Sequence, residues 1–362
     1  MKFTIPAGDF LEGLKSVQAR TKGASLEILK HIRFSVTGER LTLLGHDQSS
    51  SSEARLAVAD GTDGACAVPG DSIVRLIGSL PRNAHVTVHR DDFQITIKTG
   101  RSRYKLPVLV ADDFPDPLPC TPMATVDLDA KAITQLFDRP RAALDPRETR
   151  SFFLGAYLHS VDGVLCAAAT DGKHFTRYSS DVACPELVGV IVPSAALEEI
   201  SKLGPGKLSV SDRTVSYETA TRRFSSKLIE ATYVDYDRGV PKLIEKYVEV
   251  DRAELLACFQ RLASVSKPDS QLHLAVGDGE IVMSVAGAGE GIETISCSGE
   301  PDPDSFVAAS VEQFIDAMKM LNGEVLQLHI GPRMSAFRIV DAFEPAAIVA
   351  QSTQIPRNMV TA

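Results

Sequence analysis

Few residues in this sequence have the types and spacing that catalysis would need. Adjacent carboxylates at Asp112 and Asp113 could serve acid–base or metal-assisted chemistry, but they lie in a Pro-rich segment, where solvated loop residues are the simpler interpretation. The glycine run at 287–291 leads into an alternating segment typical of a strand, so it predicts a turn and not a dinucleotide-binding loop. The run at 204–207 lacks the Ser or Thr that follows the lysine of a phosphate-binding loop, and it predicts a helix end.

The sequence also shows no motif that is typical of a metal or cofactor site. The eight histidines show no H-E-x-x-H pairing, and the six cysteines lie far apart with no C-x-x-C pair among them. We therefore expect no metal and no cofactor, and cysteines that act as small buried residues. The serines at 49–52 lie in a segment that predicts an edge strand and not a nucleophile elbow.

Length and composition indicate a globular protein of several cores. The 362 residues are enough for two or three domains, and 44% hydrophobic with 23% charged residues is ordinary globular composition. No apolar stretch approaches the roughly 20 residues that span a bilayer, and Gly8 and Asp9 interrupt any signal-peptide core, so we expect a cytoplasmic protein with no membrane partner. The net charge of −9 excludes a broad basic surface, so any contact with nucleic acid has to be local.

The elements that would position any site occur as a repeat. Three times, a short alternating strand leads into an amphipathic helix, at 2–5 and 8–17, at 125–128 and 129–137, and at 247–250 and 251–262. Asp129 and Asp251 stand at two of these junctions, where a carboxylate caps the first helical turn and complements the helix dipole.

A second helix is expected later in each unit, at 73–80, 197–203 and 314–321, with Pro69 and Pro193 just inside the first two starts. The equivalent positions Pro69, Pro193 and Ala309 are 124 and 116 residues apart, close to a third of the chain. Alternating strand pairs accompany the helices at 85–88 and 93–98, at 207–210 and 214–217, and at 326–330 and 336–340. The sequence thus predicts an α+β fold of three tandem domains, 1–120, 121–245 and 246–362, each with two helices packed on β-sheets.

Several motifs, in this order along nearly the whole chain, are similar to those of the bacterial DNA sliding clamp, the beta subunit of DNA polymerase III. They are Met1-Lys2-Phe3-Thr4, Gly100-Arg101-Ser102-Arg103-Tyr104, Ala111-Asp112-Asp113-Phe114-Pro115, Ala169-Thr170-Asp171-Gly172 and Ser226-Lys227-Leu228-Ile229. The resemblance implies a processivity factor of DNA replication without a catalytic site. It also implies a head-to-tail homodimer that closes as a ring around double-stranded DNA in the nucleoid, with its helices lining the hole. A clamp loader, and polymerase and repair proteins that carry a clamp-binding motif, are its implied partners.

The helices expected to line the hole are more positively charged than the rest of the chain, as contact with DNA would require. The net charge is +3 over the segments with the first helices, 8–22, 129–150 and 251–267, and −1 over those with the second helices, 70–82, 194–207 and 310–324. The expected lining of the hole therefore has a net charge of +2, and the rest of the chain has −11. A ring stays on DNA topologically and needs no tight phosphate contact. The simpler alternative is that these are ordinary solvated helix faces.

The resemblance also assigns candidate residues for DNA contact and ring closure. The DNA candidates, on loops and helix ends, are Arg20, Lys22, Arg139, Arg141 and Arg147, while Ala24 stands where the family has an arginine. The ring interface is expected to place Tyr104 and Leu106 of one chain against Ser264 and Val265 of the next, although the family is more apolar at the position of Ser264. Exposed surface arginines and ordinary strand or loop residues are the alternatives.

Partner proteins are expected to dock a short peptide in a pocket between the second and third domains. By position, the pocket residues are Phe153, Thr170, Gly172, Lys173, His174, Phe175, Val234, Arg238, Gly239, Val349, Ala350 and Gln351. Val234 replaces a proline of the family, Gly239 a valine, and residues 349–353 replace the family's V-V-M-P-M, which removes adaptable apolar surface. We expect weakened or altered partner choice. Taken alone, Thr170-Asp171-Gly172 predicts only a hairpin turn.

Two other functions stay open at this point. A specialised or degenerate clamp paralogue could act as a DNA-associated regulator with altered partners. A nuclease or phosphotransferase built on α+β repeats is the alternative from the class of enzymes, and it would need convergent carboxylates or a metal set.

Overall fold

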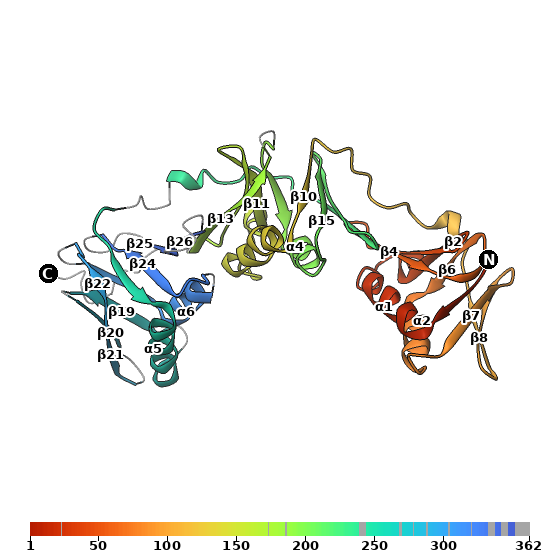
Figure 1. The fold of residues 1–362 in the computed structure, drawn as a ribbon, viewed down its shortest axis with the longest axis horizontal. Coiled ribbons are helices and arrows are strands. Elements are labelled where there is room, and N and C mark those ends of the chain that lie inside the picture. Colours follow the sequence, from red (N-terminus) through yellow and green to blue (C-terminus); the bar gives the residue numbers. More distant parts are fainter. Residues whose placement is uncertain are drawn as a thin grey trace. The chain divides into compact units, whose positions relative to one another are not determined.

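The structure is a computed structural model, and it describes most of the chain. The described residues are 1–22, 24–172, 174–184, 187–238, 244–267, 270–277, 279–286, 289–302, 305–319, 321–331, 337–341 and 347–351. They form two compact units, of which the first comprises residues 1–130 and 199–228 and the second residues 131–198 and 229–362 (Figure 1). The two units divide the expected central domain 121–245 between them.

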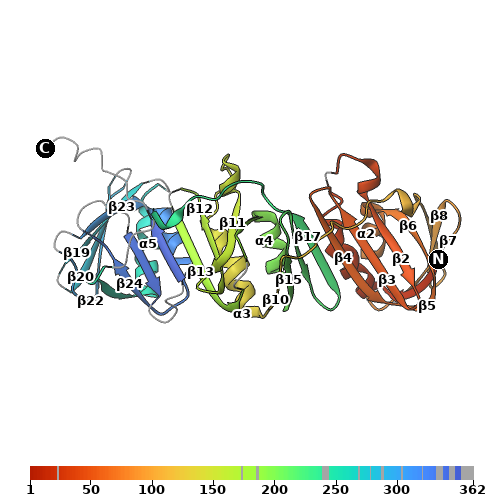
Figure 2. The ribbon, with the colours of Figure 1, turned by 90° about the horizontal axis from the view of Figure 1, so that it is seen from above.

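The first unit contains two antiparallel sheets. Its strands are β1 (Lys2–Pro6), β2 (His31–Thr37), β3 (Arg40–His46), β4 (Ser50–Ala57), β5 (Ala59–Thr62), β6 (Gly64–Pro69), β7 (His85–Arg90), β8 (Gln94–Thr99), β9 (Ser102–Pro107), β10 (Ala124–Leu128), β15 (Gly206–Val210), β16 (Thr214–Glu218) and β17 (Arg222–Lys227). The five-stranded sheet has the order β5-β1-β7-β8-β9, and the eight-stranded sheet the order β10-β15-β16-β17-β4-β3-β2-β6. Figure 2 labels most strands of the eight-stranded sheet.

Helices α1 (Ala7–Gln18) and α2 (Gly70–Gly78) pack on these sheets in the first unit. The buried residues of α1 include Phe10, Leu14 and Val17, which recur at three- and four-residue spacing and give the helix one apolar face. Phe10 lies edge-on to Phe3 of β1, with the ring centroids 5.7 Å apart, and edge-on to Phe34 of β2 at 5.8 Å. This aromatic group joins helix and both sheets into one core.

The second unit also contains two antiparallel sheets. Its strands are β11 (Gly155–Val161), β12 (Val164–Thr170), β13 (His174–Ala183), β14 (Val190–Pro193), β18 (Val248–Asp251), β19 (Gln271–Val276), β20 (Glu280–Val285), β21 (Gly291–Ser296), β22 (Ser298–Gly299), β23 (Phe306–Ser310), β24 (Val325–His329), β25 (Phe337–Asp341) and β26 (Ala347–Gln351). The nine-stranded sheet has the order β14-β11-β12-β13-β26-β25-β24-β18-β22, and the four-stranded sheet the order β21-β20-β19-β23.

Helix α3 (Ala130–Ile133) and the long α5 (Arg252–Val265) and α6 (Val311–Lys319) lie in the second unit, and α4 (Ser194–Ser201) spans the division between the units. Asp251 caps α5 as expected, because its side chain accepts a hydrogen bond from the backbone N–H of Glu254 at 2.7 Å. Phe259 of α5 stacks on Phe314 of α6 with the centroids 5.0 Å apart, which ties the two helices into one core.

Most predicted elements are confirmed, but the prediction is wrong about the two prolines, the helix at 129–137 and the serine-rich strand. Pro69 is the last residue of β6 and the N-cap of α2, and Pro193 ends β14, so neither proline lies inside its helix. The helix expected to run evenly through 129–137 is α-helical only to Ile133 and continues as a π-helix over Thr134–Asp138. The cause is Pro140 in the 3-10 helix that follows, because a proline has no N–H for the regular ladder and crowds the preceding turn.

The serine-rich strand β4 is not an edge strand. It lies between β3 and β17, and Ser51 and Ser52 pair with Ser225 and Phe224 of β17. An equivalent junction joins β13 to β26 in the second unit, where Phe175 pairs with Ala350. Each large sheet is therefore continuous across a boundary of the three expected domains.

Candidate functional site

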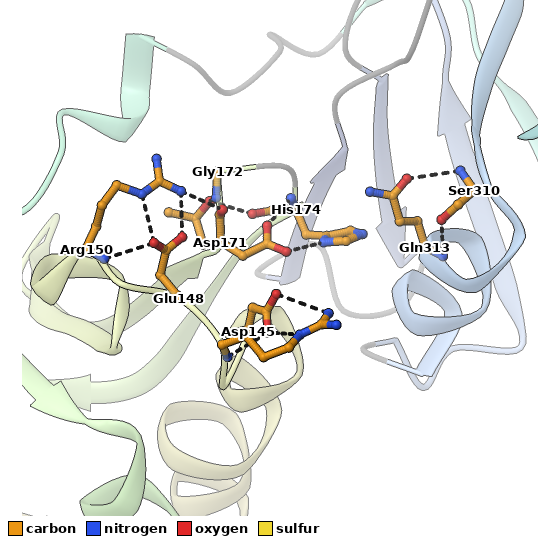
Figure 3. A network of polar contacts seen from close by, with 10 residues as sticks. Asp145, Glu148, Arg150, Asp171, Gly172, His174, Ser310 and Gln313 are labelled. Carbon is orange, nitrogen blue, oxygen red and sulfur yellow. Dashed lines mark hydrogen bonds and ion pairs between the residues drawn. The ribbon is translucent and has the colours of Figure 1, made fainter. Parts of the chain in front are cut away.

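The Thr170-Asp171-Gly172 turn between β12 and β13 is held by its own side chains. The hydroxyl of Thr170 accepts the N–H of Gly172 at 2.9 Å and donates to the carbonyl of His174 at 2.5 Å. One carboxylate oxygen of Asp171 accepts the backbone N–H of His174 at 2.7 Å, and the other lies 2.9 Å from its Nδ1 (Figure 3). Gly172 has a φ of +86°, a conformation that glycine adopts at low cost.

The pairing with Asp171 orients the imidazole of His174. In the neutral ring, Nδ1 donates to the carboxylate, so Nε2 is left as an acceptor. Nε2 is buried and has no hydrogen-bond partner within the described part of the chain. The turn therefore presents a fixed imidazole at the start of β13.

A polar cleft of about 470 Å³ opens beside this turn. The turn contributes Asp171 and His174, the loop before the 3-10 helix Ser151–Phe153 contributes Asp145 and Arg147, and the start of α6 contributes Glu312, Gln313 and Asp316. Gln313 caps α6 reciprocally with Ser310, with N–O distances of 3.0 and 3.3 Å (Figure 3).

Two carboxylates on the loop beside the turn are strongly paired. The backbone N–H and the guanidinium of Arg147 lower the pKa of Asp145. The guanidinium of Arg150, followed by its backbone N–H, lowers the pKa of Glu148 to about 2. Arg150 also donates to the carbonyl of Asp171 at 3.2 Å and covers the ring of Phe153 at 4.4 Å. Arg150 thus links the loop, the turn and the first candidate pocket residue.

An aromatic cluster packs against the same sheet. Tyr157 of β11 stacks in parallel on Tyr233 with the centroids 4.7 Å apart, and His159 Nε2 lies 2.7 Å from the hydroxyl of Tyr236. Phe175 contacts Tyr236 at 4.9 Å. Burial raises the pKa of Tyr233 and of Tyr236 and lowers the pKa of His159, so all three are neutral at neutral pH.

The structure brings several of the candidate pocket residues together. Phe153, Thr170 and Phe175 are buried, and an added Cβ on Gly172 would lie 3.5 Å from the ring of Phe153. The backbone of β26 pairs with β13, which places Val349, Ala350 and Gln351 opposite Thr176, Phe175 and His174. Val234 is half-buried, and Arg238 is exposed and paired with Asp235 at 3.0 Å. Lys173 and Gly239 lie outside the described residues.

Sequence reasoning did not find the aromatic cluster. Tyr157 and His159 alternate along β11, which places them on one face of the sheet. Their partners Tyr233 and Tyr236 follow some 75 residues later in a segment without strand periodicity. The alternation alone could have indicated half of the cluster.

The five arginine and lysine candidates differ in how much of their charge is available. Arg20 is mostly buried, bonds Ser50 at 2.7 Å and pairs with Asp47 at 3.3 Å. Arg141 pairs with Asp138 at 3.4 Å and with Glu198 at 3.6 Å, and Arg139 lies over the ring of Tyr178 at 5.5 Å. Arg147 is 89% exposed beside Asp145, and Lys22 is exposed on the turn after α1. Lys22 and Arg147 are the accessible members of the set.

Comparison with known proteins decides the family. Residues 1–119 match the model of the N-terminal domain of the DNA polymerase III beta subunit, and residues 127–235 match the model of its central domain. The beta sliding clamp of Caulobacter vibrioides is 28% identical over 300 residues, which are 78% of this chain and 80% of that protein. The chain belongs to the bacterial beta sliding clamp family.

Solved sliding-clamp structures have the same fold as this chain. The DNA polymerase sliding clamp from Caulobacter crescentus is 26% identical with a TM-score of 0.89, over 98% of this chain and 100% of that one. The DNA polymerase III subunit beta from Pseudomonas aeruginosa has a TM-score of 0.92 at 23% identity, over the same shares. The α+β clamp fold is therefore shared over nearly the whole length.

The family is that of the sliding clamps, which are processivity factors of DNA polymerase. Within the described residues, no group of three or more His, Cys, Asp or Glu side chains could hold a metal ion, and no helix is long and apolar enough to cross a membrane. Asp112 and Asp113 lie exposed in the 3-10 helix Ala111–Asp113.

The residues expected at the clamp's ring interface lie beside edge strands of the sheets. Tyr104 and Leu106 belong to β9, which ends the five-stranded sheet and is exposed along nearly its whole length. Ser264 and Val265 end α5, which packs against β21 at the edge of the four-stranded sheet. Val265 is 46% exposed, and the hydroxyl of Ser264 donates to the carbonyl of Arg261 at 2.6 Å.

Proposed function

We propose that this clamp-family chain forms a head-to-tail homodimeric ring around duplex DNA and tethers DNA polymerase to its template in the nucleoid. It does so without catalysis, as three tandem domains, 1–120, 121–245 and 246–362, and a clamp loader opens the ring for DNA. The family models at 1–119 and 127–235 support the first two of these domains.

The ring proposal rests on two open sheet edges, the strands β9 and β21. Strand β9 exposes a row of backbone groups and the basic side chains Arg103 and Lys105, and β21 carries Glu293 and the 75% exposed Ile292. An edge strand is a template for pairing with another chain. Glu293 is already paired with Arg261 at 2.7 Å, so the exposed apolar residues of the two edges, and not their charges, favour a closed heterologous contact between copies.

The mass of the particle in solution tests the ring. Light scattering is expected to give a dimer of about 78 kDa, twice the 39.0 kDa of the chain, and a stable monomer would refute the proposal. Tyr104→Glu should shift the particle toward monomer by placing a carboxylate in the contact. Val188→Glu is the matched control, because Val188 is 86% exposed in the second unit and far from both edge strands in sequence.

Retention on DNA tests the tether itself. With a clamp loader present, the protein should stay on circular DNA in high salt and leave when the DNA is linearised. Electrostatic binding cannot produce this pattern, because it weakens with salt regardless of topology. Loss from circular DNA in high salt, in a preparation that is dimeric, would instead support a clamp paralogue that acts as a DNA-associated regulator.

For the partner site, we propose that a short peptide of polymerase and repair proteins binds over Phe153, Thr170, Gly172 and Phe175, beside β26. The buried aromatic side chains would receive apolar anchors, and the edge of the polar cleft would orient the peptide backbone. The cleft contributes four carboxylates, Asp145, Asp171, Glu312 and Asp316, against the single guanidinium of Arg147. A partner with a basic or polar residue beside its apolar anchor therefore fits better than a wholly apolar one.

Peptide binding measured by fluorescence polarisation tests this altered preference. A standard clamp-motif peptide should bind this chain more weakly than it binds an ordinary bacterial clamp, and adding a lysine beside the motif should recover part of the affinity. Equal affinity of the standard peptide for both proteins would show that the substitutions at Val234 and 349–353 are without effect on partner choice.

A further inference from the structure

A second cavity, which we call the seam pocket, lies in the first unit where β4 pairs with β17. It has a volume of about 250 Å³ and is lined by Lys15 and Ser16 of α1, Glu199 and Lys202 at the end of α4, and Ser52 and Arg222 on the two strands, among others. The peptide pocket and the polar cleft lie in the other unit. The seam pocket is therefore a separate feature of the chain.

Strand alternation separates the charges at this junction onto two faces. Arg222 pairs with Ala54 and Phe224 with Ser52, so Arg222 and Phe224 lie on one face of the sheet, where the guanidinium of Arg20 covers the Phe224 ring at 5.9 Å. Arg55 pairs with Glu53 at 2.7 Å and with Glu218 at 2.6 Å on the opposite face. Glu53 also lines the seam pocket, and its carboxylate is neutralised by this pairing with Arg55.

The face toward the helices has an excess of positive charge. Glu199 is the carboxylate there, and it already lies 3.3 Å from Nζ of Lys202 and 3.9 Å from the guanidinium of Arg20. Lys15 and Arg222 have no carboxylate within ion-pair distance among the residues that the structure describes. Lys15 of α1 and Arg222 of β17 therefore line one cavity whose two carboxylates, Glu53 and Glu199, are paired with other cations.

We propose that the seam pocket binds a phosphate group. The guanidinium of Arg222 offers the two parallel N–H donors that match two phosphate oxygens, and Lys15 adds a mobile ammonium. One water occupies about 30 Å³ of liquid, so a cavity of about 250 Å³ admits a phosphate with several waters around it. The phosphate belongs either to the backbone of duplex DNA, which rests on the proposed function, or to a soluble phosphate compound, which does not.

Calorimetric titration of the full chain with inorganic phosphate and with pyrophosphate tests the proposal. The wild type should bind one anion per chain saturably, and Arg222→Gln should weaken binding by about tenfold or more, because a charge-assisted hydrogen-bonding pair is lost. Lys15→Gln, at an exposed helix position, should weaken binding without disturbing the fold. Arg213→Gln is the matched control, because it removes the same charge from a residue that is 78% exposed and lies outside the pocket.

Titration with a short DNA duplex at low salt identifies the source of the phosphate. If Arg222→Gln weakens duplex binding more than Arg213→Gln does, the seam pocket holds a backbone phosphate. If it weakens only the binding of phosphate or pyrophosphate, the ligand is a soluble compound. The proposal is overturned if Arg222→Gln and Arg213→Gln behave alike toward both ligands. Because neither titration requires ring closure, this failure is distinct from failure of the clamp function.

Discussion

Replacing Gly172 by alanine tests whether the backbone of the turn, and not its packing, fixes the start of β13. At a φ of +86° a residue with a Cβ costs about 1–2 kcal/mol. The new Cβ would lie 3.2 Å from Nη2 at the far end of the Arg150 side chain, which has to shift by a few tenths of an ångström, and 3.5 Å from the Phe153 ring, so crowding adds less than the backbone does. Alanine recovers about 0.4–1 kcal/mol through a less flexible unfolded chain. The net loss is expected to be roughly 1 kcal/mol.

Native-state hydrogen exchange of peptides that cover β12 and β13 measures this loss locally. Gly204→Ala is the matched control, because an added Cβ there meets nothing within 4 Å and the backbone is not left-handed; it should be neutral or slightly stabilising. Gly172→Asn separates the causes, since asparagine tolerates the left-handed region better than alanine does. If asparagine destabilises the hairpin more than alanine does, crowding dominates and the backbone argument is refuted.

Three further predictions concern stability and pH. Phe10→Ala should lower the free energy of unfolding, measured in urea, by about 3–5 kcal/mol, because Phe10 is fully buried between Phe3 and Phe34. Phe93→Ala should change it little, because Phe93 is 84% exposed, and equal effects of the two variants would contradict the core described. Asp251→Ala should lower the free energy of unfolding by about 1 kcal/mol, because α5 loses its cap. The Glu254 amide should then exchange faster with solvent, and unchanged exchange would count against the cap. Burial, with a smaller contribution from Asp127, raises the pKa of Tyr217 to about 12, so the unfolding free energy that this tyrosine contributes should be intact below pH 10 and fall as pH rises toward 12. Tyr217→Phe should flatten that fall, and a slope unchanged in this variant would assign it to other groups.

The repeated elements could be predicted because their information is local. Spacing of apolar residues places α1 and α5 within a few residues, and the carboxylate of Asp251 marks a helix start by its own chemistry. Local patterns fail where a distant residue decides the outcome. Ser50 and its neighbours look like an edge because β17, their partner, lies some 170 residues away along the chain. Similarly, the π-helical turn before Arg139 follows from Pro140 and not from the residues in that turn.

The candidate sites divide in the same way. The Thr170-Asp171-Gly172 turn could be placed because its hydrogen bonds join residues close in sequence. The stacking of Tyr157 on Tyr233 and the pairing of β26 with β13 depend on how two distant segments are aligned, and the pattern within one segment does not give this alignment. Exposure could not be read from the sequence either, and it separates the accessible Arg147 from the enclosed Arg20.

The sheets that run without a break through β4–β17 and β13–β26 affect how this protein can be dissected. A fragment that ends after residue 120 would keep β4 but lose β17, and its bare edge would carry unsatisfied backbone donors and acceptors along residues 50–54. Such a fragment is prone to self-association or strand exchange with another copy. Truncation therefore does not yield a clean module, and a domain can be gained or lost in evolution only together with a neighbour that covers its edge.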